Sequence, residues 1–70
     1  MDKMGLLKDL NKTSRGNFFT IDIPTNSTKE EEKIEELARE LEREGKIRIR
    51  ECIQKESSVY IQGIIKYAAN

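Results

Sequence analysis

The feature that most constrains this chain is a capped amphipathic helix that runs through a glycine into two strand-like segments. Ser27 followed three residues later by Glu30 is a capping-box pattern, which satisfies backbone N–H groups at the start of a helix. Gly45 can adopt the left-handed conformation that ends a helix, so we predict a helix over residues 28–44. Its apolar residues form one narrow stripe that must face a sheet or another helix: Ile34, Leu37, Ala38 and Leu41.

Three segments have the alternating pattern of β-strands. Residues 47–53 and 59–67 follow the helix, are rich in β-branched side chains, and are separated by a turn near residues 55–58. An earlier strand is predicted over residues 17–23, where β-branched and aromatic side chains dominate. Pro24 ends this strand, because proline has no N–H to donate to a sheet.

The register of the last two strands follows from their apolar residues, because a slip of one residue moves every side chain to the other face of the sheet. The set to be placed on one face is Ile47, Ile49 and Ile53 with Val59, Ile61, Ile65 and Tyr67, which defines a single set of opposite residues. These are Ile53 with Ile61, Ile49 with Ile65, and Glu51 with Gly63. A glutamate opposite a glycine on the core side indicates a bulge, or the edge of the sheet, at this point.

The chain also carries a shorter apolar repeat near its start. Met4, Leu7 and Leu10 follow one another at intervals of three, with Leu6 beside them, which predicts a short helix with one apolar face over residues 3–12. The turn-forming residues 11–17 come next. The predicted order is helix, strand, helix, strand, strand, in one small α+β domain that takes up the whole chain. We expect a three-stranded, mainly antiparallel sheet packed by the long amphipathic helix and the short N-terminal helix.

The composition narrows the possible chemistry. The 70 residues include no histidine and a single cysteine, Cys52, so neither a Ser-His or Cys-His catalytic pair nor a structural zinc site can be assembled from this sequence. A chain of this length buries only about 60% of the surface that its unfolded form exposes, which leaves little material for a deep cleft. We therefore predict a non-enzymatic protein that uses no metal and no cofactor.

Charge and hydropathy bear on the partner and the location. Lys and Arg number 13 and Asp and Glu number 13, so the net charge is zero and electrostatic binding must come from a local patch. No segment approaches the roughly 18 apolar residues of a membrane span, and the first residues lack the apolar run of a signal peptide. One cysteine suits a reducing compartment. We expect a cytoplasmic protein with no membrane partner.

The second half of the chain resembles part of a known DNA-binding architecture. The run from Ile34 to Ile49, with its leucines, its glycine and the hairpin that follows, is similar to the last helix and wing of a winged-helix domain, and the resemblance extends to Tyr67. In that family the helix before the wing enters the major groove and basic wing residues contact phosphate. The resemblance therefore implies DNA contacts for Lys46, Arg48, Arg50 and Lys55.

The sheet face opposite the long helix is a second candidate binding surface. Bases of a single-stranded nucleic acid can stack on Phe18 and Tyr60 there, while cations neutralise the phosphates. We expect instead that the N-terminal helix covers this face and buries Phe18 and Ile64. The residues assigned to the face are Phe18, Thr20, Arg48, Arg50, Cys52, Tyr60, Gln62, Ile64 and Lys66.

These patterns identify an architecture and leave the particular function unknown. We expect a small interaction module whose partner is a protein in preference to nucleic acid, with self-association into a homodimer through an edge strand or a residual apolar sheet face. One alternative is a winged-helix-like nucleic-acid-binding regulator. The other is an inhibitor of a basic protein, because residues 28–44 carry eight Glu against four Lys or Arg.

Overall fold

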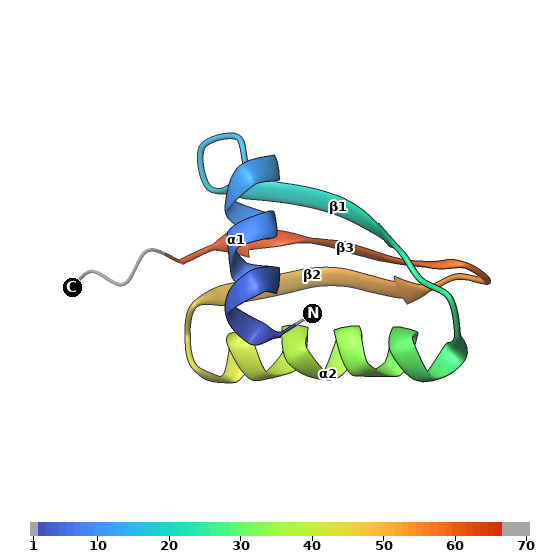
Figure 1. Ribbon diagram of the computed structural model, residues 1–70. Coiled ribbons are helices and arrows are strands. Elements are labelled where there is room, and N and C mark those ends of the chain that lie inside the picture. The colour runs from blue at the N-terminus through green and yellow to red at the C-terminus, as the bar shows by residue number, and fades with distance from the viewer. Residues whose placement is uncertain (1, 67–70) are drawn as a thin grey trace.

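The structure of the protein, a computed structural model, describes residues 2–66 and contains the predicted order of elements (Figure 1). The elements are α1 (Lys3–Thr13), β1 (Phe18–Pro24), α2 (Thr28–Arg43), β2 (Ile47–Gln54) and β3 (Ser58–Ile65). The α-β-α-β-β order and the α+β class are therefore confirmed. The predicted extension of the last strand to Tyr67 lies outside the described residues.

The three strands form an antiparallel sheet in the order β1-β3-β2. A short turn joins β2 to β3, which is a connection that only antiparallel neighbours can use. Between β1 and β2 the chain passes through α2, and β1 lies on the other side of β3. β3 is therefore the central strand, and β1 and β2 form the two edges of the sheet.

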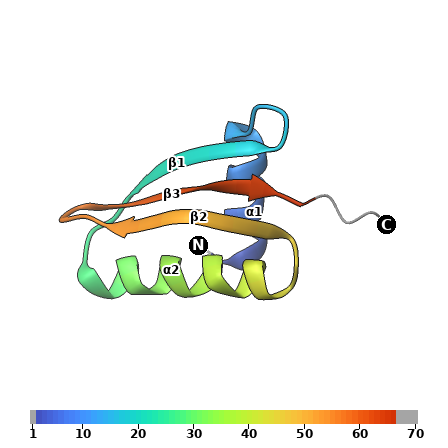
Figure 2. The ribbon, with the colours of Figure 1, turned by 180° about the vertical axis from the view of Figure 1, so that it is seen from behind.

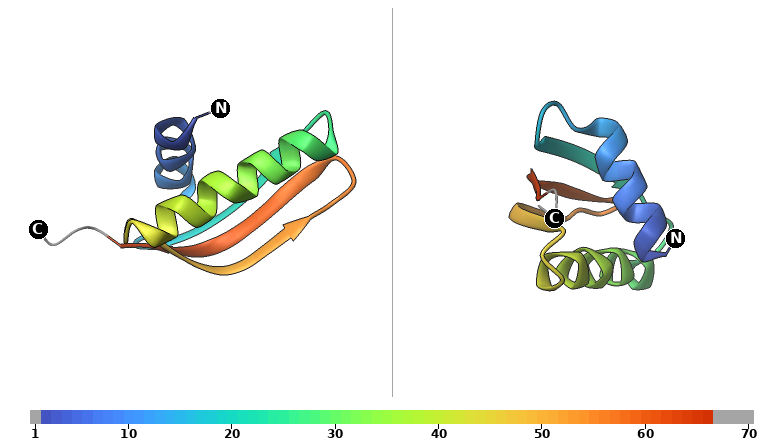
Figure 3. Two further views of the ribbon diagram at one scale, coloured as in Figure 1. Left: turned by 90° about the horizontal axis from the view of Figure 1, so that it is seen from below. Right: turned by 90° about the vertical axis from the view of Figure 1, so that its left-hand side faces the viewer.

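Both helices pack on the same face of this sheet (Figure 3). α2 packs mainly on β2, and α1 packs on β1 and against α2. Because α2 lies toward the β2 side, the buried Phe19 of β1 needs a second cover, and the fully buried Leu6 and Leu10 of α1 complete the core there. The expectation that this helix covers the opposite face and buries Phe18 and Ile64 is wrong.

The hydrophobic core is one cluster between the sheet and the two helices. The predicted stripe of α2 is buried along its whole length, and the central strand contributes two fully buried side chains, Val59 and Ile61. Each fully buried aliphatic side chain contributes about 1.5–3 kcal/mol relative to exposure. The buried members are Leu6, Leu10, Phe19, Ile23, Ile34, Leu37, Ala38, Leu41, Ile47, Val59, Ile61 and Ile65.

Local hydrogen bonds set the ends of α2. The Ser27 hydroxyl oxygen accepts the Glu30 N–H at 3.1 Å, and Gly45 takes a φ of +80° just after the helix, as the sequence predicts. The Glu30 carboxylate accepts the N–H of Asn26 at 2.8 Å, one residue earlier than the reciprocal bond of a capping box. Two backbone donors at the start of the helix are therefore satisfied, although one is not the predicted donor.

The register between β2 and β3 differs from the predicted one. The observed pairs include Ile47 with Ile65, Ile49 with Gly63, Cys52 with Ile61, and Ile53 with Tyr60. The predicted pairs of Ile53 with Ile61, Ile49 with Ile65, and Glu51 with Gly63 are wrong. Relative to the predicted pairs, the partner on β3 is displaced by two residues at the start of β2 and by one residue at its end. A displacement of one residue turns a side chain to the other face, so Ile53 changes faces.

A β-bulge near Glu51 causes the change of register, at the point where the sequence indicates a bulge or the edge of the sheet, and β2 is also an edge strand. The pairing shifts between Ile49 and Glu51, so Arg50 is an extra residue on β2. The β2 backbone lies so close to β3 here that a Cβ on Gly63 would be 2.2 Å from the carbonyl oxygen of Arg48. A glycine is therefore required at this crossing of the two strands.

Two glutamates anchor α2 to its surroundings. Glu31 is only 5% exposed, and its carboxylate accepts a hydrogen bond of 3.0 Å from the Thr25 hydroxyl. Glu42 accepts the backbone N–H of Ile49 at 2.9 Å. The second contact matters for the sheet edge, because it occupies a β2 donor that would otherwise be free to pair with another strand.

Candidate binding surface

The face of the sheet turned away from α1 and α2 carries no helix of the described part of the chain (Figure 2). We call it the open sheet face. Its side chains come from alternate positions of β1 and β3, and from β2 on both sides of the bulge. They are Phe18, Thr20, Asp22, Tyr60, Gln62, Ile64, Arg48, Arg50, Glu51 and Ile53.

Cross-strand pairing arranges nine of these side chains in three rows. The rows are Phe18, Ile64 and Arg48; Thr20, Gln62 and Glu51; and Asp22, Tyr60 and Ile53. Apolar side chains occupy the two outer rows, where Phe18 is 45% exposed and Ile53 is 42% exposed. The middle row is polar throughout, so the face has two apolar ends and a hydrogen-bonding centre.

A cation lies over the aromatic ring in the first outer row. The Cζ atom of Arg50 is 5.5 Å from the ring centroid of Phe18, within the range of about 6 Å for a cation–π contact. Arg50 starts from β2 and Phe18 from β1, so the side chain reaches across the central strand. The bulge makes this contact possible, because Arg50 is the extra residue of β2 and lies on the open sheet face together with Arg48.

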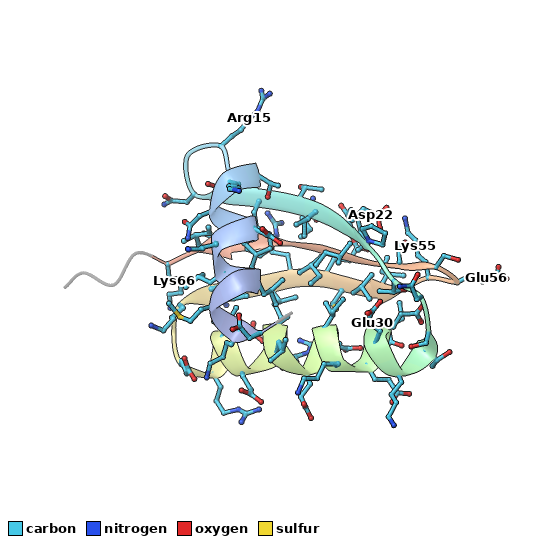
Figure 4. All side chains as sticks on the ribbon, viewed as in Figure 1. Arg15, Asp22, Glu30, Lys55, Glu56 and Lys66 are labelled. Carbon is cyan, nitrogen blue, oxygen red and sulfur yellow. The ribbon has the colours of Figure 1, made fainter. Side chains whose placement is uncertain are left out.

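The second outer row repeats the arrangement at the hairpin. The Nζ atom of Lys55 is 5.4 Å from the ring centroid of Tyr60 and 3.3 Å from the carboxylate of Asp22. Figure 4 shows Asp22 and Lys55 near each other toward the hairpin end of the sheet. The Ser58 hydroxyl, followed by Lys55, stabilises the charged carboxylate and lowers the pKa of Asp22 below its ordinary value.

Five of the six predicted contact residues lie on or beside the open sheet face. The six are Phe18, Tyr60, Lys46, Arg48, Arg50 and Lys55. Lys46 stands apart in the turn between α2 and β2, where its carbonyl oxygen accepts the N–H of Lys66 at 2.9 Å. Lys66, which was also assigned to the face, lies just past β3, at the end of the sheet away from the hairpin (Figure 4).

Three residues of β2 lie on the opposite face from the predicted one. Cys52, assigned to the open sheet face, instead packs against the core, where burial, and then the charge of Glu35, raises the pKa of its thiol. Glu51 and Ile53, both predicted to face the core, lie on the open sheet face. The signal for all three is in the sequence, since the consecutive polar residues Arg50 and Glu51 break the alternation of β2.

The outward side of α2 is acidic and partly neutralised by its own ion pairs. Arg39 lies 3.5 Å from Glu35 and 3.6 Å from Glu42, and Lys3 of α1 lies 3.6 Å from Glu40. Residues 28–44 nevertheless carry eight Glu against four Lys or Arg, a net charge of −4. The two sides of the molecule therefore differ in charge, and the cations of β2 and the hairpin are on the side away from this helix.

Hollows on the surface of the described residues include a wide, open one of about 620 Å³ along α1, lined by Asp2, Gly5, Lys8, Asp9 and Lys12. A shallow hollow of about 230 Å³ at the start of α2 contains one carboxylate, Glu30, which already accepts a backbone N–H. Within residues 2–66, no group of three or more His, Cys, Asp or Glu is placed to hold a metal ion. Neither helix of this part of the chain is long and apolar enough to cross a bilayer.

Comparisons of the chain with protein-family models, with curated proteins and with solved structures found no match. The interpretation of the open sheet face therefore rests on its own residues and on the packing that leaves it uncovered.

Proposed function

We propose that this protein is a non-enzymatic interaction module that binds a macromolecular partner across the open sheet face. One-sided packing supports this most directly, because both helices lie on the other face while Phe18 and Ile53 stay 45% and 42% exposed. A chain of about 60 residues buries only about 60% of its unfolded surface, so apolar side chains outside the core are a cost to stability. Their presence on a rigid sheet is typical of a binding surface.

The proposal places binding on the face of the sheet and not on the β2 edge. Edge strands associate through unpaired backbone groups, and a bulge or a covering helix blunts such an edge. At β2 the Ile49 N–H already donates to Glu42, and Arg50 bulges out of the ladder. If the chain self-associates, the contact is therefore expected on the open sheet face and not at the β2 edge.

The proposal of a non-enzymatic role in the cytoplasm is supported by the chemistry of the side chains. The sequence has no histidine, and the raised pKa of Cys52 suppresses the thiolate that a nucleophile requires. In the hollow at the start of α2, which Glu30 and Lys33 line, the Glu30 carboxylate already accepts the N–H of Asn26 at 2.8 Å. A single half-buried thiol suits a reducing compartment.

The winged-helix-like regulator is a second candidate, supported by the exposure of Arg48 and Arg50 on β2. It requires α2 to approach DNA, and the net charge of −4 on residues 28–44 opposes that approach. The acidic-helix inhibitor would use α2 alone. The three candidates therefore place the contact on different surfaces, which makes them separable by mapping.

Backbone amide NMR distinguishes these surfaces. A protein concentration series reports self-association, and titrations with single-stranded DNA, duplex DNA and polylysine report the other modes. We expect the amide shifts to lie on the strands, at the residues whose side chains form the open sheet face. Shifts confined to α2, or no shifts with any of the probes, contradict the proposal.

Surface variants give a second test. Phe18→Ala and Ile53→Ser should weaken the binding that the NMR map detects while the fold is kept, because both side chains are largely outside the core. Met4→Ala is the matched control, since Met4 is a 61% exposed apolar side chain on α1. Charge reversal at Glu35 and Glu36 should have no effect, and loss of binding there would favour the acidic-helix inhibitor.

A further inference from the structure

We infer that the open sheet face binds single-stranded nucleic acid, with bases stacked on Phe18 and Tyr60 and phosphates paired with the neighbouring cations. The inference rests on the proposed function, because it names the partner of the same surface. The observation that carries it is a repeated arrangement. One ring has a cation 5.5 Å from its centroid at one end of the face, and the other has a cation 5.4 Å from its centroid at the hairpin end.

Each aromatic–cation pair offers the two groups that a nucleotide requires. A base of any identity can stack on a ring through its π face, and a basic side chain beside the ring can neutralise the phosphate. Arg50 carries a planar guanidinium that binds phosphate through two N–H groups and also stacks on flat rings. Lys55 is a compact charge on a flexible stem, so it can turn from the Tyr60 ring to a phosphate when a base takes its place.

The spacing of the two rings suits an extended strand. Phe18 lies opposite Ile64, which is four residues from Tyr60 on β3. At about 3.4 Å per residue, the two rings are about 14 Å apart along the strands. Successive nucleotides in one strand of B-DNA rise only about 3.4 Å along the helix axis, so neighbouring stacked bases cannot occupy both rings. A single strand with splayed bases can, with further nucleotides over the middle row.

The polar middle row favours nucleic acid over an apolar protein surface. Gln62 offers donors and an acceptor, the Thr20 hydroxyl offers both kinds of group, and the Glu51 carboxylate accepts from base amino groups, so base edges and sugars can satisfy the row. A second copy of the chain that sealed the two apolar ends would bury these groups as well, and buried polar groups without partners are destabilising. The apolar side chains are thus placed as two stacking sites and not as one continuous dimer patch.

The charge distribution favours an anion on this side of the molecule. On or beside the open sheet face, Arg48, Arg50 and Lys55 stand against Glu51 and Asp22, a net charge of +1, whereas residues 28–44 have a net charge of −4. Asp22, the other acid of the face, is paired with Lys55 at 3.3 Å. A strand on the sheet therefore meets cations, while a duplex docked on α2 meets the acidic helix.

The test is fluorescence anisotropy of labelled oligonucleotides of mixed sequence, as single-stranded DNA, single-stranded RNA and the matching duplex. We expect the single strands to bind more tightly than the duplex. With two to four phosphates neutralised, at about −0.7 per phosphate, log K should fall with log salt at a slope of about −1.4 to −2.8. That slope is roughly a 7- to 50-fold loss of affinity between 50 and 200 mM salt.

Leucine substitutions separate stacking from apolar contact. Phe18→Leu and Tyr60→Leu keep the apolar bulk but remove the flat ring, so each should weaken single-strand binding by about 5- to 150-fold, the range for loss of one stacked base. A complex sealed by apolar packing is little changed by the same substitutions. Circular dichroism of the Tyr60 variant checks that the half-buried position on the central strand still supports the fold.

Charge-neutralising pairs supply a matched control. Arg50→Gln with Lys55→Gln should make the salt slope shallower by about 1.4, because two phosphate contacts are removed. Lys29→Gln with Arg43→Gln removes the same charge from α2 and should leave both affinity and slope unchanged. Equal effects of the two pairs would show that binding follows total charge and not the open sheet face.

Three results overturn the inference, and they differ in what they say of the proposed function. Tighter binding to duplex than to either single strand supports the winged-helix candidate instead. No binding to any oligonucleotide, together with concentration-dependent amide shifts on the open sheet face, excludes nucleic acid and leaves the proposed interaction surface intact. Single-strand binding that only the α2 pair weakens contradicts both proposals.

Discussion

Gly63 is the position where one added methyl group tests the bulged register most directly. A Cβ there would lie 2.2 Å from the carbonyl oxygen of Arg48 and 2.9 Å from the Cζ atom of Phe19. Carbon–oxygen contacts between neighbouring strands are normally about 3.3–3.6 Å long, so the overlap with the carbonyl oxygen exceeds about 1 Å. Because the obstructing atom belongs to the backbone, Gly63→Ala has to push β2 away from β3 or tilt Phe19 within the core.

The expected loss of stability follows from two opposing effects. Overpacking of a close-packed site costs about 1–3 kcal/mol, and the backbone clash places this site at the upper end. Alanine recovers about 0.5–1 kcal/mol in the middle of a strand, because glycine loses more conformational freedom on folding. We expect Gly63→Ala to lower the free energy of unfolding by about 2 kcal/mol, from a total of about 3–5 kcal/mol for a domain of this size.

Urea unfolding followed by circular dichroism measures this difference. Gly5→Ala is the control with the same chemical change, because its added Cβ meets only a side chain, the Asp2 carboxylate at 3.0 Å, which caps α1 by accepting the Gly5 N–H, and alanine is favoured inside a helix. The control should lose less stability than Gly63→Ala. A Gly63→Ala variant with native stability would refute the close approach of β2 and the register derived from it.

Three further predictions concern the core, a buried hydrogen bond and a surface carboxylate. Leu37→Ala removes a buried side chain of the α2 stripe and should lower the free energy of unfolding by about 2–5 kcal/mol in the same assay, whereas native stability would mean that another side of α2 faces the sheet. Thr25→Val leaves the buried Glu31 carboxylate without its hydrogen bond and should lower the free energy of unfolding by about 1–3 kcal/mol. Thr25→Ser keeps the hydroxyl, so equal stability of the two variants would contradict this prediction. The contacts of Asp22 lower its pKa in the folded state, so they stabilise the fold fully at pH values above the ordinary carboxyl pKa of about 4. This stabilisation is lost as the pH falls below about 4 and through the folded-state pKa. A carboxyl NMR titration should show a depressed midpoint for Asp22 that rises in Lys55→Gln, and an undisturbed midpoint in both proteins would exclude the pairing.

The helices, the strands and their ends were predictable because their causes are local. The Ser27 cap, the left-handed Gly45 and the stripe of α2 act within a few residues of one another, and each appears in the structure where the sequence places it. The same holds for the hairpin turn and the α-β-α-β-β order. Even the bulge near Glu51 has a local signal, since a charged residue interrupts the apolar alternation of β2.

The candidate site was predictable in part of its members and not in its geometry, since Glu51 and Ile53 were placed on the other face and Cys52 was wrongly included. Phe18, Tyr60 and the cations of β2 were identified from their types, but no local pattern pairs Arg50 with Phe18 or Lys55 with Tyr60. Those pairs depend on which strands become neighbours, and the cost of a close backbone crossing at Gly63 decides how the bulge is absorbed.

The sequence by itself therefore determined the elements of this protein, their order and the charge of each. Only the tertiary structure decided which face of the sheet α1 covers, because Leu6 and Leu10 are buried equally well against any apolar surface within reach. α2 packs mainly on β2 and leaves Phe19 of β1 to be covered, so α1 packs beside α2. Packing α1 beside α2 buries the apolar surface of β1 that α2 leaves uncovered, which is favourable. Packing it on the open sheet face would instead bury a polar middle row, which is unfavourable, so that face is left open.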